Sequence, residues 1–74
     1  MKTSIDLQDN YLKLVTAERI PVVIYLVNGV QLRGLVCGFD NFTILLENEG
    51  RQEMIYKHAV STISPQKPIQ LKLE

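Results

Sequence analysis

The sequence predicts a mainly β fold, in which one N-terminal helix precedes a strongly bent, open barrel of five strands. Apolar residues recur at helical spacing only before Pro21, and β-branched and aromatic residues form short runs after it. Turn signals built from Gly, Asn and Asp separate these runs. Gly34 and Gly38 interrupt the second run, as expected where a strand of a small barrel bends or bulges. A chain of 74 residues forms one domain.

A helix is expected over residues 6–18. Asp6 or Ser4 can cap its start, and Asp9 lies where a negative charge stabilises the first turn. Pro21 and the β-branched residues after it are expected to end the helix. The apolar positions at helical spacing are Leu7, Tyr11, Leu12, Leu14 and Val15.

Five short strands are expected between about residues 21 and 64. Asn28-Gly29 is a strong signal for a two-residue hairpin, so the second strand is expected to begin directly at Val30. Asp40 is expected to bond nearby backbone amides in the next turn rather than to act as an acid. The first, third, fourth and fifth strands are expected at 22–27, 42–47, 52–56 and about 60–64.

Two prolines, Pro65 and Pro68, are expected to close the domain. This predicts one domain of residues 1–68 and a short C-terminal tail of residues 69–74. The tail alternates apolar and polar residues, so it could add a strand or fray.

Composition limits the chemistry that the chain can carry. Cys37 is the only cysteine and His58 the only histidine, so an internal disulfide is impossible and no metal site or cofactor is expected. No apolar run approaches the roughly 20 residues that cross a bilayer. The first residues do not read as a signal peptide, so we expect a cytoplasmic protein without membrane contact. Because so small a core is marginal, oligomerisation is the expected stabilising device.

One cluster, Tyr56-Lys57-His58, combines side chains that suit single-stranded nucleic acid. Rings stack on bases, an ammonium neutralises phosphate, and an imidazole hydrogen-bonds either. The formal net charge of zero counts against nucleic acid. That objection weakens if copies form a ring, because Lys57 would then become a circle of cations around one axis.

Four motifs occur together in the chain: Leu7-Gln8-Asp9, Tyr25-Leu26-Val27-Asn28-Gly29, Gly38-Phe39-Asp40-Asn41-Phe42 and Tyr56-Lys57-His58-Ala59-Val60-Ser61-Thr62. Through this combination the chain closely resembles Hfq, the bacterial Sm-like family of RNA chaperones, over roughly residues 5–68. The resemblance implies an Sm-like, SH3-type barrel, a homohexamer formed by edge-strand pairing, and no small-molecule substrate.

The resemblance also implies two RNA-binding faces, which would promote the pairing of two RNAs and so regulate genes after transcription. The proximal face, around the pore, would bind uridine-rich small regulatory RNA through Gln8, Asn41, Phe42, Lys57 and His58. The distal face would bind adenine- or purine-rich mRNA through Tyr25, Leu26, Asn28, Gly29, Val30, Leu32, Gln52 and Thr62.

The chain departs from the family pattern at the outer rim of the expected ring and at the distal face. Thr16 and Ala17 stand where relatives often carry a basic cluster, which leaves Lys13 and Arg19 as weak rim contacts. Glu53 stands where relatives often carry a Gln that reads adenine. Either Gln52 replaces that Gln through a shifted register, or the reading of adenine is weakened.

Two other classes of function compete with RNA binding. An SH3-like module that binds proline-rich peptides would want several aromatic residues and commonly Trp, which this chain lacks. An enzyme would need a base with an orienting partner, a carboxylate cluster or a nucleophile with its base. The single histidine has only Tyr56 and Lys57 beside it, so no catalytic residue is assigned.

Overall fold

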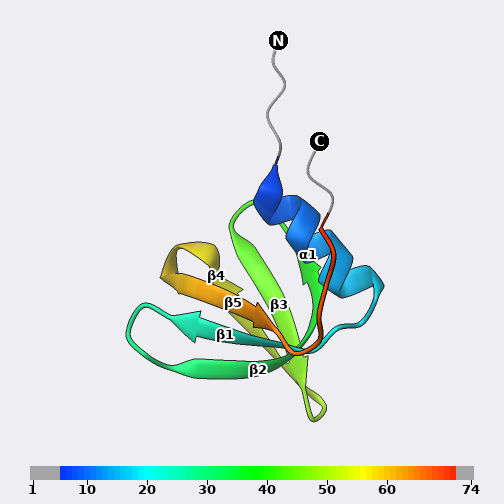
Figure 1. Cartoon of the computed structure of the whole chain (residues 1–74). Coiled ribbons are helices and arrows are strands. Elements are labelled where there is room, and N and C mark those ends of the chain that lie inside the picture. Colours follow the sequence, from blue (N-terminus) through cyan, green and yellow to red (C-terminus); the bar gives the residue numbers. More distant parts are fainter. Residues whose placement is uncertain (1–5, 72–74) are drawn as a thin grey trace.

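The computed structural model describes residues 6–71, which form one helix and a bent antiparallel sheet (Figure 1). The elements in chain order are α1 (Leu7–Ala17), β1 (Val22–Leu26), β2 (Gln31–Phe39), β3 (Thr43–Asn48), β4 (Arg51–Tyr56), the 3-10 turn η1 (Lys57–Ala59) and β5 (Val60–Pro65). The strand order across the sheet is β4-β3-β2-β1-β5. The predicted helix and all five predicted strands are confirmed, and η1 links β4 to β5.

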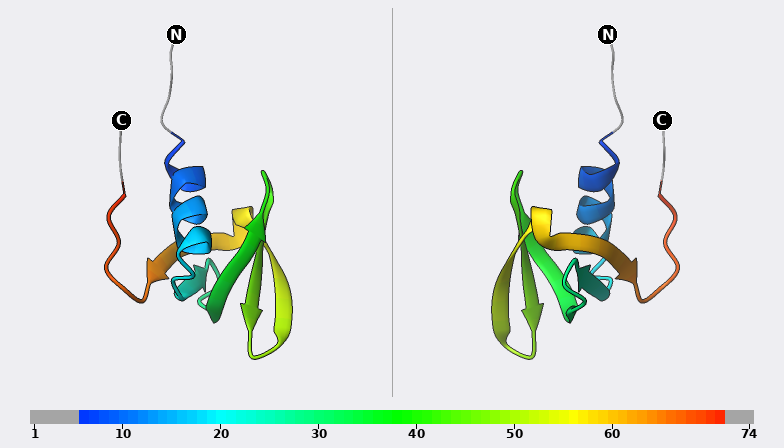
Figure 2. Two further views of the ribbon diagram at one scale, coloured as in Figure 1. Left: turned by 90° about the vertical axis from the view of Figure 1, so that its right-hand side faces the viewer. Right: turned by 90° about the vertical axis from the view of Figure 1, so that its left-hand side faces the viewer.

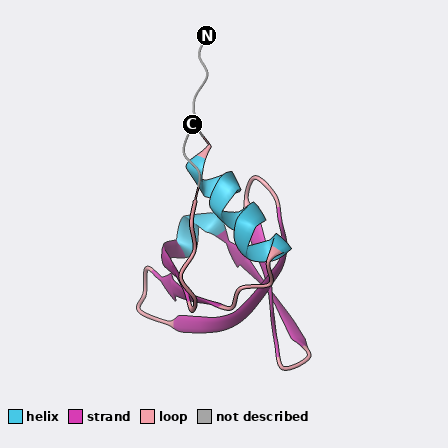
Figure 3. Ribbon diagram, turned by 45° about the vertical axis from the view of Figure 1, so that its right-hand side comes forward, coloured by secondary structure: helices cyan, strands magenta, loops and turns pink. Residues whose placement is uncertain are grey.

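The helix covers one side of the curved sheet, as Figure 3 shows. Asp6 is its N-cap, because Asp6 Oδ1 accepts a hydrogen bond of 3.2 Å from the Asp9 backbone N–H. Ser4, the other candidate cap, lies outside the described residues. Leu12 and Val15 are fully buried, whereas Leu7 is 51% exposed. Leu12 and Val15 therefore form the buried centre of the apolar stripe, and Leu7 lies at its exposed end.

The end of α1 differs from the prediction. The backbone N–H of Arg19 donates to Thr16 O at 3.3 Å, and that of Ile20 donates to Val15 O at 3.0 Å. These two bonds form a Schellman motif, which requires a left-handed residue, and Arg19 has φ 52°. The helix therefore ends through its own backbone bonds, before the chain reaches Pro21.

The first hairpin also differs from the prediction. The backbone N–H of Leu26 donates to Val30 O at 2.8 Å, so three residues, Val27 to Gly29, form the loop instead of two. Gly29 has φ 93°, whereas Asn28 does not have a positive φ. Instead, Asn28 Oδ1 accepts a hydrogen bond of 3.1 Å from the Val30 N–H. This is a turn followed by a left-handed glycine, the usual form of a three-residue hairpin loop.

The irregularities of β2 lie at its two glycines, where the sequence predicts a bend or bulge. At Gly34 an added Cβ would overlap the backbone carbonyl oxygen of Glu47 on β3, so only a glycine lets these strands approach so closely. Farther along, Val36 pairs with Leu46 and Gly38 pairs with Leu45, which leaves Cys37 as the extra residue of a bulge. The bulge and the close approach together curve the sheet around its core.

One face of the sheet, here called the inner face, carries the core. Its buried side chains from helix and strands are Leu12, Val15, Ile20, Val22, Ile24, Val36, Ile44, Leu46 and Ile55. The opposite face is called the outer face. β4 and β5 are the two edge strands of the described sheet, so each has one side without a strand partner within residues 6–71.

The chain after β5 runs back along α1 (Figure 2). Ile69 packs against the core, and residues 69–71 form no strand. Residues 72–74 of the predicted tail lie outside the described residues. Of the alternatives for the tail, a further strand is therefore ruled out only for residues 69–71.

Within residues 6–71, the one α-helix is too short to cross a membrane.

Candidate nucleic-acid interface

Lys57 is held in place by three contacts from different parts of the chain. Its backbone N–H donates to Phe42 O at 2.8 Å, which ties η1 to the β2–β3 turn. Its Nζ lies 4.0 Å from Asp9 Oδ1 of α1 and 5.7 Å from the centroid of the Phe39 ring. The side chain is only 13% exposed. The cation is therefore fixed between a carboxylate and an aromatic face before any ligand arrives.

The β2–β3 turn is built around Asp40. Asp40 Oδ1 accepts hydrogen bonds from the Phe42 N–H at 2.9 Å and from the Thr43 N–H and Thr43 hydroxyl, both at 2.8 Å. The bond from the Phe42 backbone, followed by those from Thr43, holds the pKa of the Asp40 carboxyl below its ordinary value. The prediction of a turn residue is confirmed. The turn leaves Asn41 exposed, and Phe42 is 74% exposed.

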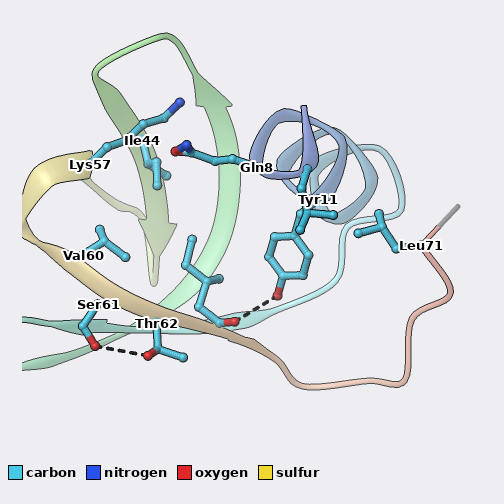
Figure 4. Close-up of a pocket in the computed structure, with 10 residues that line it drawn as sticks. Gln8, Tyr11, Ile44, Lys57, Val60, Ser61, Thr62 and Leu71 are labelled. Carbon is cyan, nitrogen blue, oxygen red and sulfur yellow. Dashed lines mark hydrogen bonds between the residues drawn. The ribbon is translucent and has the colours of Figure 1, made fainter. Parts of the chain in front are cut away.

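A groove of about 610 Å³ lies between α1 and β5, with Gln8 and Lys57 at one end. Figure 4 shows the polar ends of these two side chains near each other at the groove. Tyr11 lines the middle, where its hydroxyl donates to Ile63 O at 3.3 Å and burial raises its pKa. The walls are mainly apolar, and they include Leu7, Ile44, Val60 and Leu71. Apolar walls with a few polar groups at one end suit a flat, polar-edged ligand.

His58 is exposed beside the groove and stacks on Tyr56. The two ring centroids are 5.7 Å apart, and the ring planes are inclined by 20°. Figure 2 shows η1 and the β2–β3 turn at the end of the molecule where α1 begins, and the β3–β4 hairpin at the opposite end. All five residues predicted for the proximal face therefore lie on elements that meet at one end: α1, the β2–β3 turn and η1.

The residues predicted for the distal face fall into two groups. Tyr25 pairs with Gln31 on one side and with Thr62 on the other, so these three side chains share the outer face. Figure 4 shows Thr62 pointing to the other side of β5 from Val60. Leu26 and Leu32, in contrast, pack against the core on the inner face.

The remaining distal candidates lie at the first hairpin and on β4. Asn28, Gly29 and Val30 form or follow the hairpin loop, and all three are exposed. Gln52 pairs with Glu47 and is exposed on the outer face, whereas Glu53 pairs with the buried Leu46. There is no bulge between β3 and β4, so the register does not shift in favour of Gln52. Glu53, not Gln52, shares the inner face with Leu26 and Leu32.

The two rim candidates lie along and just after α1. Lys13 is exposed and lines a second groove with Asn10 and Glu18. Arg19 is exposed at the left-handed position after the helix. The two cations do not form a cluster with Lys57.

Sequence reasoning missed several residues that shape the site. Asp9 and Phe39 position Lys57, and Tyr11 lines the groove. Asp9 is 48 positions from Lys57 in the chain, so no local pattern connects them. Gln31 was missed as the cross-strand neighbour of Tyr25, although the alternation along β2 could have pointed to it. No three His, Cys, Asp or Glu side chains gather as a metal site in the part of the chain that the structure describes.

Three comparisons with known proteins agree with one another. The family model described as "Hfq protein" matches residues 7–70. "RNA-binding protein Hfq" of Halalkalibacterium halodurans is 55% identical over 74 residues, covering all of this chain and 95% of that protein. The protein of the same name from Pelotomaculum thermopropionicum is 62% identical over 68 residues, covering 92% of this chain and 82% of that protein. A crystal structure titled as the pleiotropic translational regulator Hfq superposes with a TM-score of 0.77 at 34% identity, covering 80% of this chain and 98% of that one.

Proposed function

This chain belongs to the Hfq family, and from that premise we propose that it is an RNA chaperone that brings small regulatory RNA and mRNA together. The relatives are named as RNA-binding proteins, and the family is not one of enzymes. The observation that carries the proposal is the groove in which Gln8 and a fixed Lys57 lie together, beside an exposed Phe42.

The working form is a homohexameric ring of a domain that covers residues 1–68. Two edge strands, β4 and β5, support this assembly because each can pair with the other edge of a neighbouring copy. Such pairing is head-to-tail, so the rotation between copies can close into a ring. The ring also reconciles zero net charge with RNA binding, because it repeats Lys57 around one axis.

Uridine-rich RNA binds at the proximal face. The exposed Phe42 ring offers a stacking platform, and the Gln8 amide can both donate to and accept from a base edge. Lys57 donates to a base oxygen or a phosphate, while Asn41 and His58 reach the RNA backbone from the exposed ends of the turn and η1. Because Asp9 and Phe39 already hold the ammonium, little side-chain entropy is lost when the RNA binds.

Purine-rich mRNA binds at the distal face. Tyr25 supplies a stacking surface with Thr62 beside it, and the exposed hairpin of Asn28, Gly29 and Val30 supplies backbone and amide groups. Leu26 and Leu32 pack against the core on the inner face and so support the strands that carry Tyr25, whereas Gln52 lies on the outer face, as Tyr25 does. Holding two RNAs on one ring raises the effective concentration of each for the other. Lys13 and Arg19 make only weak contacts with RNA at the outer rim of the ring. The chaperone acts in the cytoplasm.

The test measures binding of a fluorescein-labelled six-nucleotide oligo-uridine to the full chain by anisotropy. We expect Lys57→Ala to weaken binding by about tenfold or more, the range of charge-assisted hydrogen bonds. Lys67→Ala removes the same charge at an exposed position after β5, outside the proposed RNA contacts, and serves as the matched control. Native mass spectrometry of each variant checks the hexamer. Equal affinity of the wild type and Lys57→Ala, with the hexamer intact in both, would contradict the proximal site.

A further inference from the structure

We propose that Tyr11 is a positioning residue of the proximal face. Its hydroxyl holds the first turn of α1 against β5 and thereby places the Gln8 amide beside Lys57. This inference rests on the proposed function, because it needs RNA at the end of the groove where Gln8 and Lys57 lie. Tyr11 lies outside the four sequence motifs described above.

The first turn of α1 has little apolar packing to hold it. Residues 6–8 are all exposed, and Leu7 is 51% exposed. The buried side chains of the helix, Leu12 and Val15, belong to its later turns. Because apolar burial is what fixes a short helix in place, the later turns are held more firmly than the first. The position of the first turn therefore depends on individual side-chain contacts.

Two polar contacts join the N-terminal half of α1 to other elements within residues 6–71. The Tyr11 hydroxyl donates to Ile63 O of β5 at 3.3 Å, and Asp9 Oδ1 lies 4.0 Å from Lys57 Nζ. The remaining side-chain hydrogen bonds of α1 stay within the helix and its cap. In the described part of the chain, the Tyr11 bond is thus the side-chain hydrogen bond that ties α1 to β5.

The carbonyl group of Ile63 is available for this bond. The Gln66 N–H donates to Pro21 O at 2.8 Å, and the same register pairs Ile24 with Ile63. Ladder bonds alternate along an antiparallel pair, so Ile63 directs its carbonyl away from β1 and toward the open edge of β5. Burial raises the pKa of Tyr11 above its ordinary value of 10.0, so the hydroxyl remains a donor at neutral pH. A carbonyl oxygen has two lone pairs, which leaves it able to accept a second bond when copies pair.

The position of Gln8 follows directly from the position of the helix. Gln8 is three residues before Tyr11, so the two side chains lie on one face of α1. Both line the groove, and Figure 4 shows the polar end of Gln8 near Lys57 while the Tyr11 hydroxyl is directed at β5. Among residues 6–71, no hydrogen bond of its own holds the Gln8 amide. A shift of the first turn would therefore carry this amide away from Lys57.

The test is a double-mutant cycle that combines Tyr11→Phe with Gln8→Ala in the full chain. Anisotropy measures binding of a fluorescein-labelled six-nucleotide oligo-uridine to the wild type, the two single variants and the double variant. Tyr11→Phe keeps the ring in the groove and removes only the hydroxyl. We expect it to weaken binding by about threefold to tenfold, the range of one neutral hydrogen bond. In the Gln8→Ala background the same change should alter affinity by less than about twofold, because there is no amide left to position.

Two controls separate positioning from a general effect on the helix or the ring. Thr16→Val also removes a hydroxyl from α1, but its bond of 2.7 Å to Leu12 O stays within the helix, so affinity should remain that of the wild type. Binding of an 18-nucleotide oligo-adenosine, which the distal face is proposed to hold, should be equal in Tyr11→Phe and the wild type. Native mass spectrometry should find the same hexamer in both.

Four results would overturn the assignment of Tyr11: unchanged affinity of Tyr11→Phe for oligo-uridine, an equal loss in both backgrounds, a matching loss for oligo-adenosine, or a hexamer that dissociates. Each of these leaves the proximal site standing as long as Gln8→Ala or Lys57→Ala weakens the binding of oligo-uridine. If neither substitution weakens it, the proposed function fails at the proximal site, and the role of Tyr11 fails with it.

Discussion

Gly34 is the residue on which the curvature of the sheet depends most directly, and Gly34→Ala tests this. The new Cβ would overlap the carbonyl oxygen of Glu47 and lie 3.2 Å from Leu46 Cγ. β3 cannot move aside easily, because Leu46 is fully buried in the core. Gly34 also has φ 154°, a backbone conformation that residues with a side chain rarely adopt. We expect Gly34→Ala to destabilise the folded chain.

The size of the effect follows from two contributions. Overpacking of a well-packed site costs about 1–3 kcal/mol. Backbone strain at an unfavourable φ costs about 1 kcal/mol or more. The loss in free energy of unfolding is therefore about 2–4 kcal/mol, which lowers the Tm of a domain of this size by roughly 10–30 °C.

The assay is thermal and urea unfolding followed by circular dichroism, at one fixed protein concentration because assembly shifts apparent stability. Gly38→Ala is the matched control, since an added Cβ at Gly38 meets no atom within 4 Å. We expect this control to change stability by less than about 1 kcal/mol. If the two variants unfold alike, or if Gly34→Ala keeps the stability of wild type, the close approach of β2 and β3 does not determine the fold.

Two further substitutions test features of the turns. Arg19→Gly should stabilise the chain by about 0.5–1 kcal/mol, because glycine adopts the left-handed Schellman position without the cost that Arg19 bears at φ 52°; an unchanged urea midpoint would contradict this. Asp40→Asn keeps an oxygen acceptor but removes the negative charge of the carboxyl group, whose pKa is held below its ordinary value chiefly by the hydrogen bond from the Phe42 N–H. Because the folded pKa is the lower one, the carboxylate stabilises the fold above the unfolded pKa, and this contribution is lost as the pH falls through the folded pKa. Wild type should therefore lose more of its urea midpoint than Asp40→Asn between about pH 6 and about pH 2, and parallel losses would refute it.

Elements with a strong local signal were predicted well from the sequence. The helix, the strands and the bend at Gly34 and Gly38 depend on spacing and on residue type, which are visible in the chain itself. The errors concern the ends of elements. Both the Schellman motif at Arg19 and the three-residue hairpin at Gly29 are decided by backbone hydrogen bonds that other residues complete.

The candidate site was predictable where a motif carries it and not where distant segments meet. The neighbours Tyr56, Lys57 and His58 form one cluster in the sequence. The contacts of Lys57 with Asp9 and Phe39 join three separate segments, and no periodic pattern in the sequence predicts them. The face on which Glu53 lies also needed the register of β3 and β4, because a slip of one residue would have exchanged it with Gln52.

The brevity of η1 limits how this molecule can diverge. Only three residues, Lys57 to Ala59, separate the last residue of one edge strand from the first residue of the other. A residue inserted or deleted there has to be absorbed within this short link, because a slip of β5 by one residue against β1 would turn Ile63 to solvent and Thr62 to the interior. Natural variation should therefore alter the chemistry of this link by replacing residues while keeping its length constant.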